Sequence, residues 1–540
     1  MTMDKGKELT KRLFFSWTKA LHSHQAAFWG NPKLDGALIC PACGKIHGRC
    51  VEAIYPFMAM ARTTGLSFWS KDAERLFDWA EETVSQPDGS FLNDIDSDWK
   101  GTSVFAAISF VDTLEDFGTI LEPSFKKKLE GRLLKASKYL CSEDSYLEKN
   151  TNYPVSIALL LYRSGLYFSD EKLLQKAEDY KRVCKSVMTP EGFIFGEGFM
   201  RNGRSARNLL AIDIGYNVEE TLPAMVKLGI LTKDEELLSI AERGFSKQLE
   251  FMLCDGAWDN SFGTRNFKWT YWGSRTSDGA AEGLLLLKER NALFSEAAYR
   301  NLLLMEQSTH DGLLSGGPHY GSAMQPTCIH HTFTHVRPLV SILVHDLWDN
   351  ATQSTQLLPR YQKQGVTENK DIASFVYTCS NYTATITAYD WPYMPAGHTS
   401  GGTLSLLHSS RLGPILISGM GEYWPKEKNN MQLPQGKIIH ECLDLRIEME
   451  EEDRTFSSRE CMNASLTRID KCSFLASGIL MSKKGEISTS PVHYEISYHF
   501  KENIIEIIAT CKRGTLVCPI VSRHDEEIVQ IGNKVLIEKN

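Results

Sequence analysis

The chain has 540 residues, of which 42% are hydrophobic and 23% charged, and its formal net charge is -8. This length exceeds what one hydrophobic core usually serves, so at least two domains are expected. The acidic balance gives no reason to expect nucleic acid as a partner, because phosphate binding requires a basic surface. A local basic patch for an acidic sugar stays open, because net charge does not describe clefts.

The sequence predicts neither a membrane span nor a disulfide framework. No apolar run reaches the roughly 18 residues that cross a bilayer. Residues 1–17 carry lysines but no apolar core and no small-residue cleavage site, which argues against a signal peptide. We therefore expect a cytoplasmic protein, or a periplasmic or secreted one if a leader has been removed. The 13 cysteines are an odd and scattered set, which favours reduced thiols.

Residues 8–348 have the apolar spacing of helices. Stripes at three- and four-residue intervals run through 107–117, 173–187 and 237–252, and short Gly- and Asp-rich breakers separate them. We expect roughly a dozen helices of ordinary length here. Helical hairpins in this number most often close into an α/α toroid, an inference that rests on analogy. The helix count permits six or seven hairpins.

The apolar period changes to two after about residue 371. The segments "NYTATITAYD" (381–390), "LDLRIEME" (443–450) and "HYEISYHF" (493–500) alternate in polarity, as half-buried antiparallel strands do. The polar, aperiodic stretch before them is typical of a linker. We therefore expect an α/α toroid over 1–350, a linker over 351–370 and an antiparallel β-sheet or sandwich domain over 371–540.

One loop combines aromatic and cationic residues. Residues 262–279 read "FGTRNFKWTYWGSRTSDG". Sugar rings lie on the faces of Trp and Tyr, and Arg or Lys pairs with an acidic substituent. The pattern favours a carbohydrate site, and the alternative is a buried aromatic loop with structural arginines.

Polar and aromatic residues also lie at several helix entries. Asn217 precedes a helix, and Glu220 three residues on would complete a capping box, so Asn217 has a structural as well as a catalytic interpretation. Four further residues lie at other helix entries, and an ordinary cap or turn would account for each of them taken alone. Together they place polar and aromatic groups at one end of successive hairpins, namely Trp99, Lys100, Asn152 and Tyr153.

A histidine group lies near the end of the helical region. His331 and His335 are four residues apart and share one helical face, whereas His330 points elsewhere. A two-histidine metal site is conceivable, but no Glu follows the first His as a metalloprotease requires. A general base at the mouth of the helical domain fits better, and structural histidines are the equal alternative.

The segment "CPACGKIHGRC" (40–50) holds three thiols and an imidazole. Cys40, Cys43, His47 and Cys50 are the ligand types that tetrahedral zinc prefers, and four of them would form a closed, structural site. A redox Cys-x-x-Cys pair would require a thioredoxin-like strand, against which the helical context argues. Alternatively, His47 and Arg49 line the cleft and the cysteines are only packed.

Three segments resemble one enzyme family. "DIGYNVEETLP", "WDNSFGTRNFKWTYWGSRTSDG" and "CIHHTFTHVRPL" follow one another in this order, and they resemble the bacterial L-rhamnose-α-1,4-D-glucuronate lyases. Those polysaccharide lyases remove the rhamnose caps of arabinogalactan-protein glycans by β-elimination. The resemblance covers most of the helical region and implies an acidic plant-type glycan as the partner. It implies no catalytic cofactor and no particular oligomeric state.

The resemblance also implies roles for individual residues. Such a lyase removes the C5 proton of a uronic acid, which requires that the adjacent carboxylate be neutralised. Asn217 would neutralise it with help from Arg275, His331 would be the base and Tyr271 the acid, and Tyr216 competes for either proton transfer. The residues expected to bind the sugar are Trp99, Lys100, Asn152, Arg265, Trp272 and His335.

Two other functions stay open at this point. A glycoside hydrolase on the same scaffold would need two carboxylates about 5–9.5 Å apart. Asp213, Glu219, Asp278 and Glu282 are candidates, but no sequence feature pairs them. A non-catalytic glycan-binding protein could use the loop 389–402 of the sheet domain, although it would not need more than three hundred helical residues.

Overall fold

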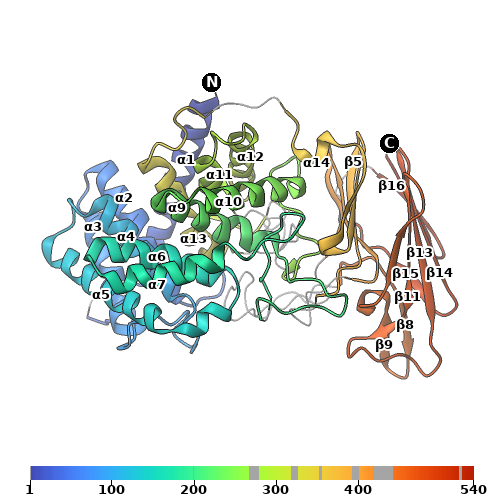
Figure 1. Cartoon of the computed structure of the whole chain (residues 1–540), viewed down its shortest axis with the longest axis horizontal. Coiled ribbons are helices and arrows are strands. Elements are labelled where there is room, and N and C mark those ends of the chain that lie inside the picture. Colours follow the sequence, from blue (N-terminus) through green and yellow to red (C-terminus); the bar gives the residue numbers. More distant parts are fainter. Residues whose placement is uncertain are drawn as a thin grey trace.

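The computed structural model describes residues 2–28, 30–198, 200–266, 279–317, 326–351, 356–391, 400–418, 442–521 and 526–539. The helical region lies on one side of the molecule and the sheets lie on the other (Figure 1). Its helices are α1 (Thr2–Ser23), α2 (Ile54–Thr64), α3 (Phe68–Thr83), α4 (Ser103–Phe117), α5 (Pro123–Ser142), α6 (Asn152–Phe168), α7 (Glu171–Cys184), α8 (Ile214–Tyr216), α9 (Leu222–Thr232), α10 (Glu235–Gln248), α11 (Ala281–Leu286), α12 (Leu293–Gln307) and α13 (Ile329–Val344).

The helices form a closed double ring. Helices α2, α4, α6, α9, α11 and α13 contact one another in that order, and α13 returns to α2. Each of them pairs with an outer helix, α3, α5, α7, α10, α12 and α1 respectively. The described residues thus form an α/α toroid of six hairpins, and the expected fold class is confirmed.

Sequence explains which helices lie inside. Inner helix α4 begins "SVFAAISFV" and carries no charge before Asp112, and almost all of its residues are buried. Outer helix α7 buries only the stripe Leu173, Ala177, Tyr180 and Cys184. A helix that is apolar all round is enclosed, whereas a striped helix faces solvent on one side. The charge-free run therefore identifies an inner helix better than a stripe does.

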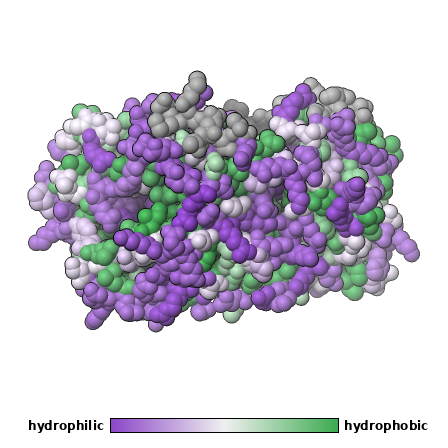
Figure 2. Space-filling view, turned by 45° about the horizontal axis from the view of Figure 1, so that its top comes forward, coloured by the Kyte–Doolittle hydropathy of each residue, from purple (hydrophilic) through white to green (hydrophobic). Residues whose placement is uncertain are grey.

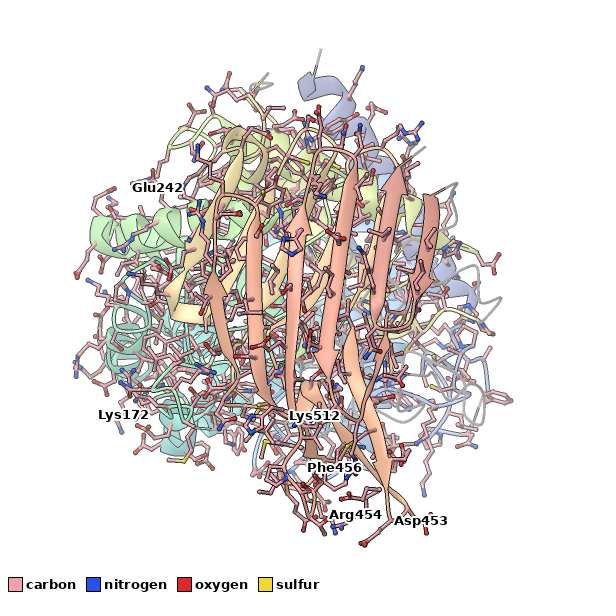
Figure 3. All side chains as sticks on the ribbon, turned by 90° about the vertical axis from the view of Figure 1, so that its right-hand side faces the viewer. Lys172, Glu242, Asp453, Arg454, Phe456 and Lys512 are labelled. Atoms are coloured by element: carbon pink, nitrogen blue, oxygen red, sulfur yellow. The ribbon has the colours of Figure 1, made fainter. Side chains whose placement is uncertain are left out.

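Three antiparallel sheets follow the toroid. Their orders are β3-β4-β5-β6-β7, β12-β9-β8-β15 and β10-β11-β13-β14-β17-β16, and the short pair β1-β2 lies within the helical region. The last of the three faces the viewer in Figure 3, with the toroid behind it. The strands are β1 (Thr309–His310), β2 (Leu313–Leu314), β3 (Gly365–Asn369), β4 (Ser374–Thr378), β5 (Tyr382–Thr387), β6 (Thr403–Ser409), β7 (Gly413–Ile417), β8 (Arg446–Glu451), β9 (Arg454–Ser457), β10 (Ser465–Arg468), β11 (Ser473–Ile479), β12 (Met481–Ser482), β13 (His493–Phe500), β14 (Ile504–Cys511), β15 (Thr515–Val517), β16 (Glu526–Ile531) and β17 (Lys534–Lys539).

Strand burial differs between the sheets. β13 alternates between buried and more exposed residues, as its sequence predicts. β5 is buried at every position, so its expected half-exposed face is wrong. The reason is that Ala384 and Ile386 face the sheet core, while Thr383 and Thr385 contact a buried arginine that comes from beside the toroid.

That arginine joins the two regions. Arg360, in α14 (Pro359–Gln362), donates to Thr383, to Thr385 and to the Asp259 carboxylate at 2.7 Å, and both charged side chains are fully buried. Both α14 and β3 fall within the segment 351–370 that we expect to be the linker. The segment therefore carries ordered structure between toroid and sheets.

Replacement of Arg360 by methionine is expected to lower the free energy of unfolding by about 3–5 kcal/mol, because Asp259 would stay buried without its cation. Urea denaturation measures the loss. Arg454→Met is the matched control, since the Arg454 pair with Glu452 is largely exposed and such pairs contribute about 0–1 kcal/mol. Equal losses in the two variants would contradict a buried ion pair between the regions.

The visible surface is mainly hydrophilic. Figure 2 shows hydrophobic residues dispersed among hydrophilic ones on this face. Of the helices in the described part of the chain, none has both the length and the apolarity needed to cross a bilayer.

Candidate active site

Polar side chains from separate segments meet at the start of inner helix α6. The Asn152 backbone N–H donates to the Glu197 carboxylate at 2.9 Å, and its side-chain amide donates to Glu220 at 2.6 Å. Arg265 lies 3.8 Å from Glu197 and places its guanidinium carbon 3.9 Å from the centre of the Tyr216 ring. We call Asn152, Glu197, Tyr216, Glu220 and Arg265 the polar cluster.

Arg265 is held in place from both sides. Its backbone N–H donates to Asp213 at 2.9 Å, and Asp213 also accepts from the Tyr216 N–H, which caps α8. The arginine side chain is almost fully buried against the Tyr216 ring. A guanidinium fixed in this way has its donors directed before an acidic sugar arrives.

Glu197 is an unusual carboxyl group for which no sequence pattern predicts a special role. Burial raises the pKa of Glu197 to about 8, Asp213 adds to the rise, and Arg265 and the Asn152 N–H oppose it. At neutral pH the group is therefore mostly protonated and can donate a hydrogen bond. The only signal in the sequence is an acidic residue within the Gly-rich run "FGEG".

The Glu197→Gln variant is expected to remove a pH dependence of stability. Between about pH 4.5 and 8 the folded protein keeps a proton that the unfolded chain releases, so this contribution is complete below that window and is lost as pH rises through it. The variant should therefore gain stability relative to the wild type by up to about 1.4 kcal/mol per pH unit. Urea denaturation across the window tests this, and parallel pH profiles would contradict it.

A second set of groups lies on α13. His335 Nε2 is 3.2 Å from the Glu219 carboxylate, and its Nδ1 is 2.7 Å from the His331 carbonyl oxygen. The His331 and His335 rings are 5.3 Å apart, and both are buried. The carbonyl and Glu219 thus fix one histidine beside the other, as expected from their spacing.

One turn connects the two sets. The π-helical turn η3 (Asn217–Thr221) directs Glu220 to Asn152 and Glu219 to His335. Asn217 is fully buried in this turn, and its side-chain amide donates to the Ile194 carbonyl at 2.8 Å. The expected N-cap role of Asn217 is wrong, because Asp213 caps the helix four residues earlier.

Other expected binding residues lie at the margin. Trp99 is 38% exposed, and its ring lies 6.1 Å from that of Tyr153. The Lys100 ammonium binds Asp88 at 2.7 Å on the exposed side, so it does not join the polar cluster. Arg49 forms a buried pair with Glu52 at 2.6 Å. Tyr271, Trp272 and Arg275 lie outside the described residues, as does Asp278.

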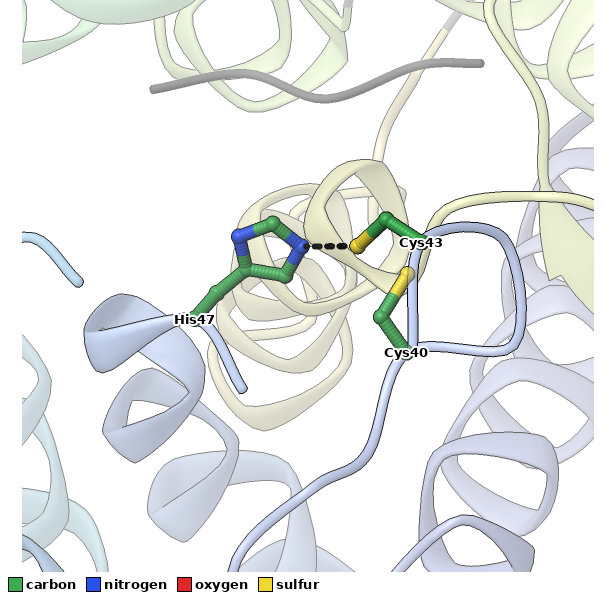
Figure 4. Close-up of side chains that lie close together, drawn as sticks. All are labelled: Cys40, Cys43 and His47. Carbon is green, nitrogen blue, oxygen red and sulfur yellow. Dashed lines mark hydrogen bonds between the residues drawn. The ribbon is translucent and has the colours of Figure 1, made fainter. Parts of the chain in front are cut away.

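The cysteine segment brings three of its four expected metal ligands together. The ligand atoms of Cys40, Cys43 and His47 all lie within 4.8 Å of one another and could hold a metal ion. In Figure 4 the two sulfurs and the imidazole point toward one another. Cys50 is not in this group, because it lies in the 3-10 helix η1 (Gly48–Ala53), where its thiol interacts with the Leu38 backbone. That part of the expected set is corrected.

Comparison with known proteins gives two family matches. Residues 14–361 match the model of the ulvan lyase N-terminal domain, and residues 366–540 match that of the ulvan lyase C-terminal domain. The broad-specificity ulvan lyase of Formosa agariphila is 32% identical over 539 residues, which cover 97% of this chain and 84% of the relative.

A solved structure supports the fold. The chondroitin AC lyase of Streptomyces coelicolor A3, in complex with chondroitin sulphate, matches with a TM-score of 0.53 at 11% identity, over 96% of this chain and 70% of that one. At this identity the match concerns the fold alone. Together with the family matches, it confirms a polysaccharide lyase with a toroid, which eliminates rather than hydrolyses. The hydrolase and binding-protein alternatives are thereby set aside.

Proposed function

The chain belongs to the ulvan lyase family, and we propose that it cleaves ulvan by β-elimination at a uronic-acid residue. The observation that carries this proposal is the fixed Arg265 guanidinium beside the buried Glu197 carboxyl, whose pKa is raised by burial to about 8. A cation and a neutral acid side by side suit a uronate carboxylate, which gains charge as the C5 proton leaves.

Arg265 and Glu197 neutralise the carboxylate in this reaction. Arg265 offers charged N–H donors, and the Glu197 O–H adds a hydrogen bond that an ionised carboxyl could not supply. Asn217 and Arg275, expected from the resemblance, assist them. Asn217 acts through the second hydrogen of the amide that binds Ile194.

His331 takes the C5 proton, and His335 with Glu219 fixes its position. Tyr271 protonates the leaving oxygen. Tyr216 competes for a proton-transfer role, since its ring lies against the Arg265 guanidinium in the polar cluster. The residues proposed from the resemblance to contact further sugar units are Trp99, Lys100, Asn152, Trp272 and His335. Lys100 would have to leave its pair with Asp88 to do so, and His335 its contact with Glu219.

No step of this reaction requires a cofactor, and an ion at Cys40, Cys43 and His47 would be structural zinc. We place the toroid over 1–350, the linker over 351–370 and the sheet domain over 371–540, with strand β3 of the linker segment joining the first sheet.

A narrower activity is the release of L-rhamnose from rhamnosyl-α-1,4-glucuronate caps of arabinogalactan. It rests on the three motifs that resemble the rhamnose–glucuronate lyases. The same uronate chemistry serves both substrates, and they differ in whether the cleaved unit is terminal.

Incubation with ulvan and, separately, with rhamnose-capped arabinogalactan tests the proposal. Absorbance of the conjugated unsaturated uronate reports elimination, and free rhamnose is measured in parallel. We expect the absorbance to rise with ulvan. A rise with arabinogalactan alone, matched by free rhamnose, would replace ulvan by the terminal cap, and no rise with either glycan would overturn the proposal.

A further inference from the structure

We propose that Cys328 completes a closed four-ligand zinc site with Cys40, Cys43 and His47, and that the ion fixes the start of helix α13. Cys328 is the residue directly before α13, and it comes from the opposite end of the toroid sequence. Its thiol sulfur lies 3.6 Å from that of Cys40 and 3.6 Å from His47 Nε2. The Cys43 sulfur is also 3.6 Å from His47 Nε2.

These three separations match those of ligands around one zinc ion. The ligand atoms that all lie within 4.8 Å of one another are those of Cys40, Cys43 and His47, so zinc would draw the Cys328 sulfur closer to Cys43. With Zn–S bonds near 2.3 Å and Zn–N bonds near 2.0–2.1 Å, a tetrahedron places its sulfurs about 3.8 Å apart and sulfur and nitrogen about 3.6 Å apart. A disulfide would instead bring two sulfurs to about 2.05 Å. At their separation of 3.6 Å, the Cys40 and Cys328 sulfurs do not form a disulfide.

The orientation of His47 is a second, independent observation. Its Nε2 faces the thiols, and its Nδ1 lies 3.1 Å from the Asp94 carboxylate, which also accepts from Asn93 at 2.6 Å. A metal-bound histidine typically donates its other ring N–H to a carboxylate in this manner. Packed thiols without a metal would not require this arrangement.

The local backbone also suits a metal. The turn of Cys40 to Cys43 is closed by the Gly44 N–H, which donates to the Cys40 carbonyl at 2.9 Å. Gly44 has a φ of 66°, in the left-handed region that glycine tolerates. Cys40, His47 and Cys328 are almost fully buried. Cys43 is partly exposed. Four protein ligands close the coordination shell and leave no position for substrate, so the ion is structural.

The consequence lies three residues further along the chain. Cys328 is followed by α13, which carries His331 and His335. Zinc at Cys328 ties the first turn of α13 to the N-terminal loop and so fixes where His331 stands. This second part rests on the proposed function, whereas the metal site does not.

The first experiment compares zinc content in the full-length protein purified without added metal. We expect about one zinc per chain in the wild type and in Cys50→Ser, and much less in Cys328→Ser after dialysis against a chelator. Cys50 is the matched control, since it is a buried thiol of the same loop outside the ligand group. Equal zinc loss from the two variants would overturn the role of Cys328.

If the Cys328→Ser variant does not fold, a measurement on the wild type tests the site instead. X-ray absorption at the zinc edge of the wild type should show three sulfur ligands and one nitrogen ligand. Two sulfurs, a wild type that takes up no zinc, or a Cys40–Cys328 disulfide found by mass spectrometry would each overturn the site.

A separate measurement tests whether zinc fixes the start of α13 and so the position of His331. Removal of zinc from the wild type should speed hydrogen exchange in the first turns of α13 and lower kcat more than it changes KM, while exchange in β13 and β14 stays the same. Unchanged exchange in α13 would overturn this part. A zinc-loaded protein inactive on both glycans would instead count against the proposed function alone.

Discussion

Replacement of His331 by alanine is expected to lower kcat by about 10²–10⁴-fold, the usual contribution of a positioned general base. KM should change little, because the imidazole acts on the C5 proton and binds little of the sugar. His331 lies beside the His335–Glu219 pair, which holds its surroundings fixed. Initial rates of unsaturated uronate formation with ulvan measure the loss.

The matched control is His345→Ala. His345 follows the last residue of α13 and is half exposed, about 20 Å along the helix from His331. Its removal should leave kcat unchanged. Tyr271→Phe should behave as His331→Ala does, because it removes the proposed acid. Near-normal turnover in both His331→Ala and Tyr271→Phe would refute the assignment of base and acid.

Arg265→Met is expected to lower kcat/KM by roughly 10- to 150-fold, which corresponds to the 1.5–3 kcal/mol of a hydrogen bond to a charged group. Lysine at this position should recover part of the loss, because it restores the charge but not the planar fork. The methionine keeps most of the contact with the Tyr216 ring. Steady-state rates across a range of ulvan concentrations give the values.

The control for Arg265 is Arg182→Met. Arg182 lies on outer helix α7 and pairs with Asp179 on the exposed surface. It should have wild-type kcat/KM. A wild-type value in Arg265→Met as well would show that this guanidinium does not neutralise the uronate.

Local patterns in the sequence predicted the architecture well. The change of apolar period predicts helices followed by strands, which is the order in the structure, although the first strand of the sheets, β3, already begins at Gly365. The family matches confirm a toroid lyase. The exposed face expected for β5 was wrong because a contact between regions buries it. The sequence of β5 does not predict this contact with Arg360, because Arg360 belongs to another element, α14.

The candidate site was predictable only where neighbours in sequence are neighbours in space. His331 and His335 share a face because they are four residues apart. Proximity in sequence predicts Cys50 as a metal ligand. In the structure the Cys328 sulfur, 288 residues away in the chain, lies 3.6 Å from the Cys40 sulfur. The sequence around Glu197 resembles that of an ordinary acidic residue in a loop. Its raised pKa could not be predicted from that sequence, because it comes from burial by distant segments.

The enzyme is expected to break its glycan by elimination, and mass spectrometry of the products formed in water labelled with heavy oxygen tests this most directly. Elimination leaves the bridging oxygen on the departing sugar, so the first products should carry no label and the new non-reducing end should be lighter by one water. Incorporation of heavy oxygen at the cleaved bond, with saturated ends, would mean hydrolysis and would contradict the account.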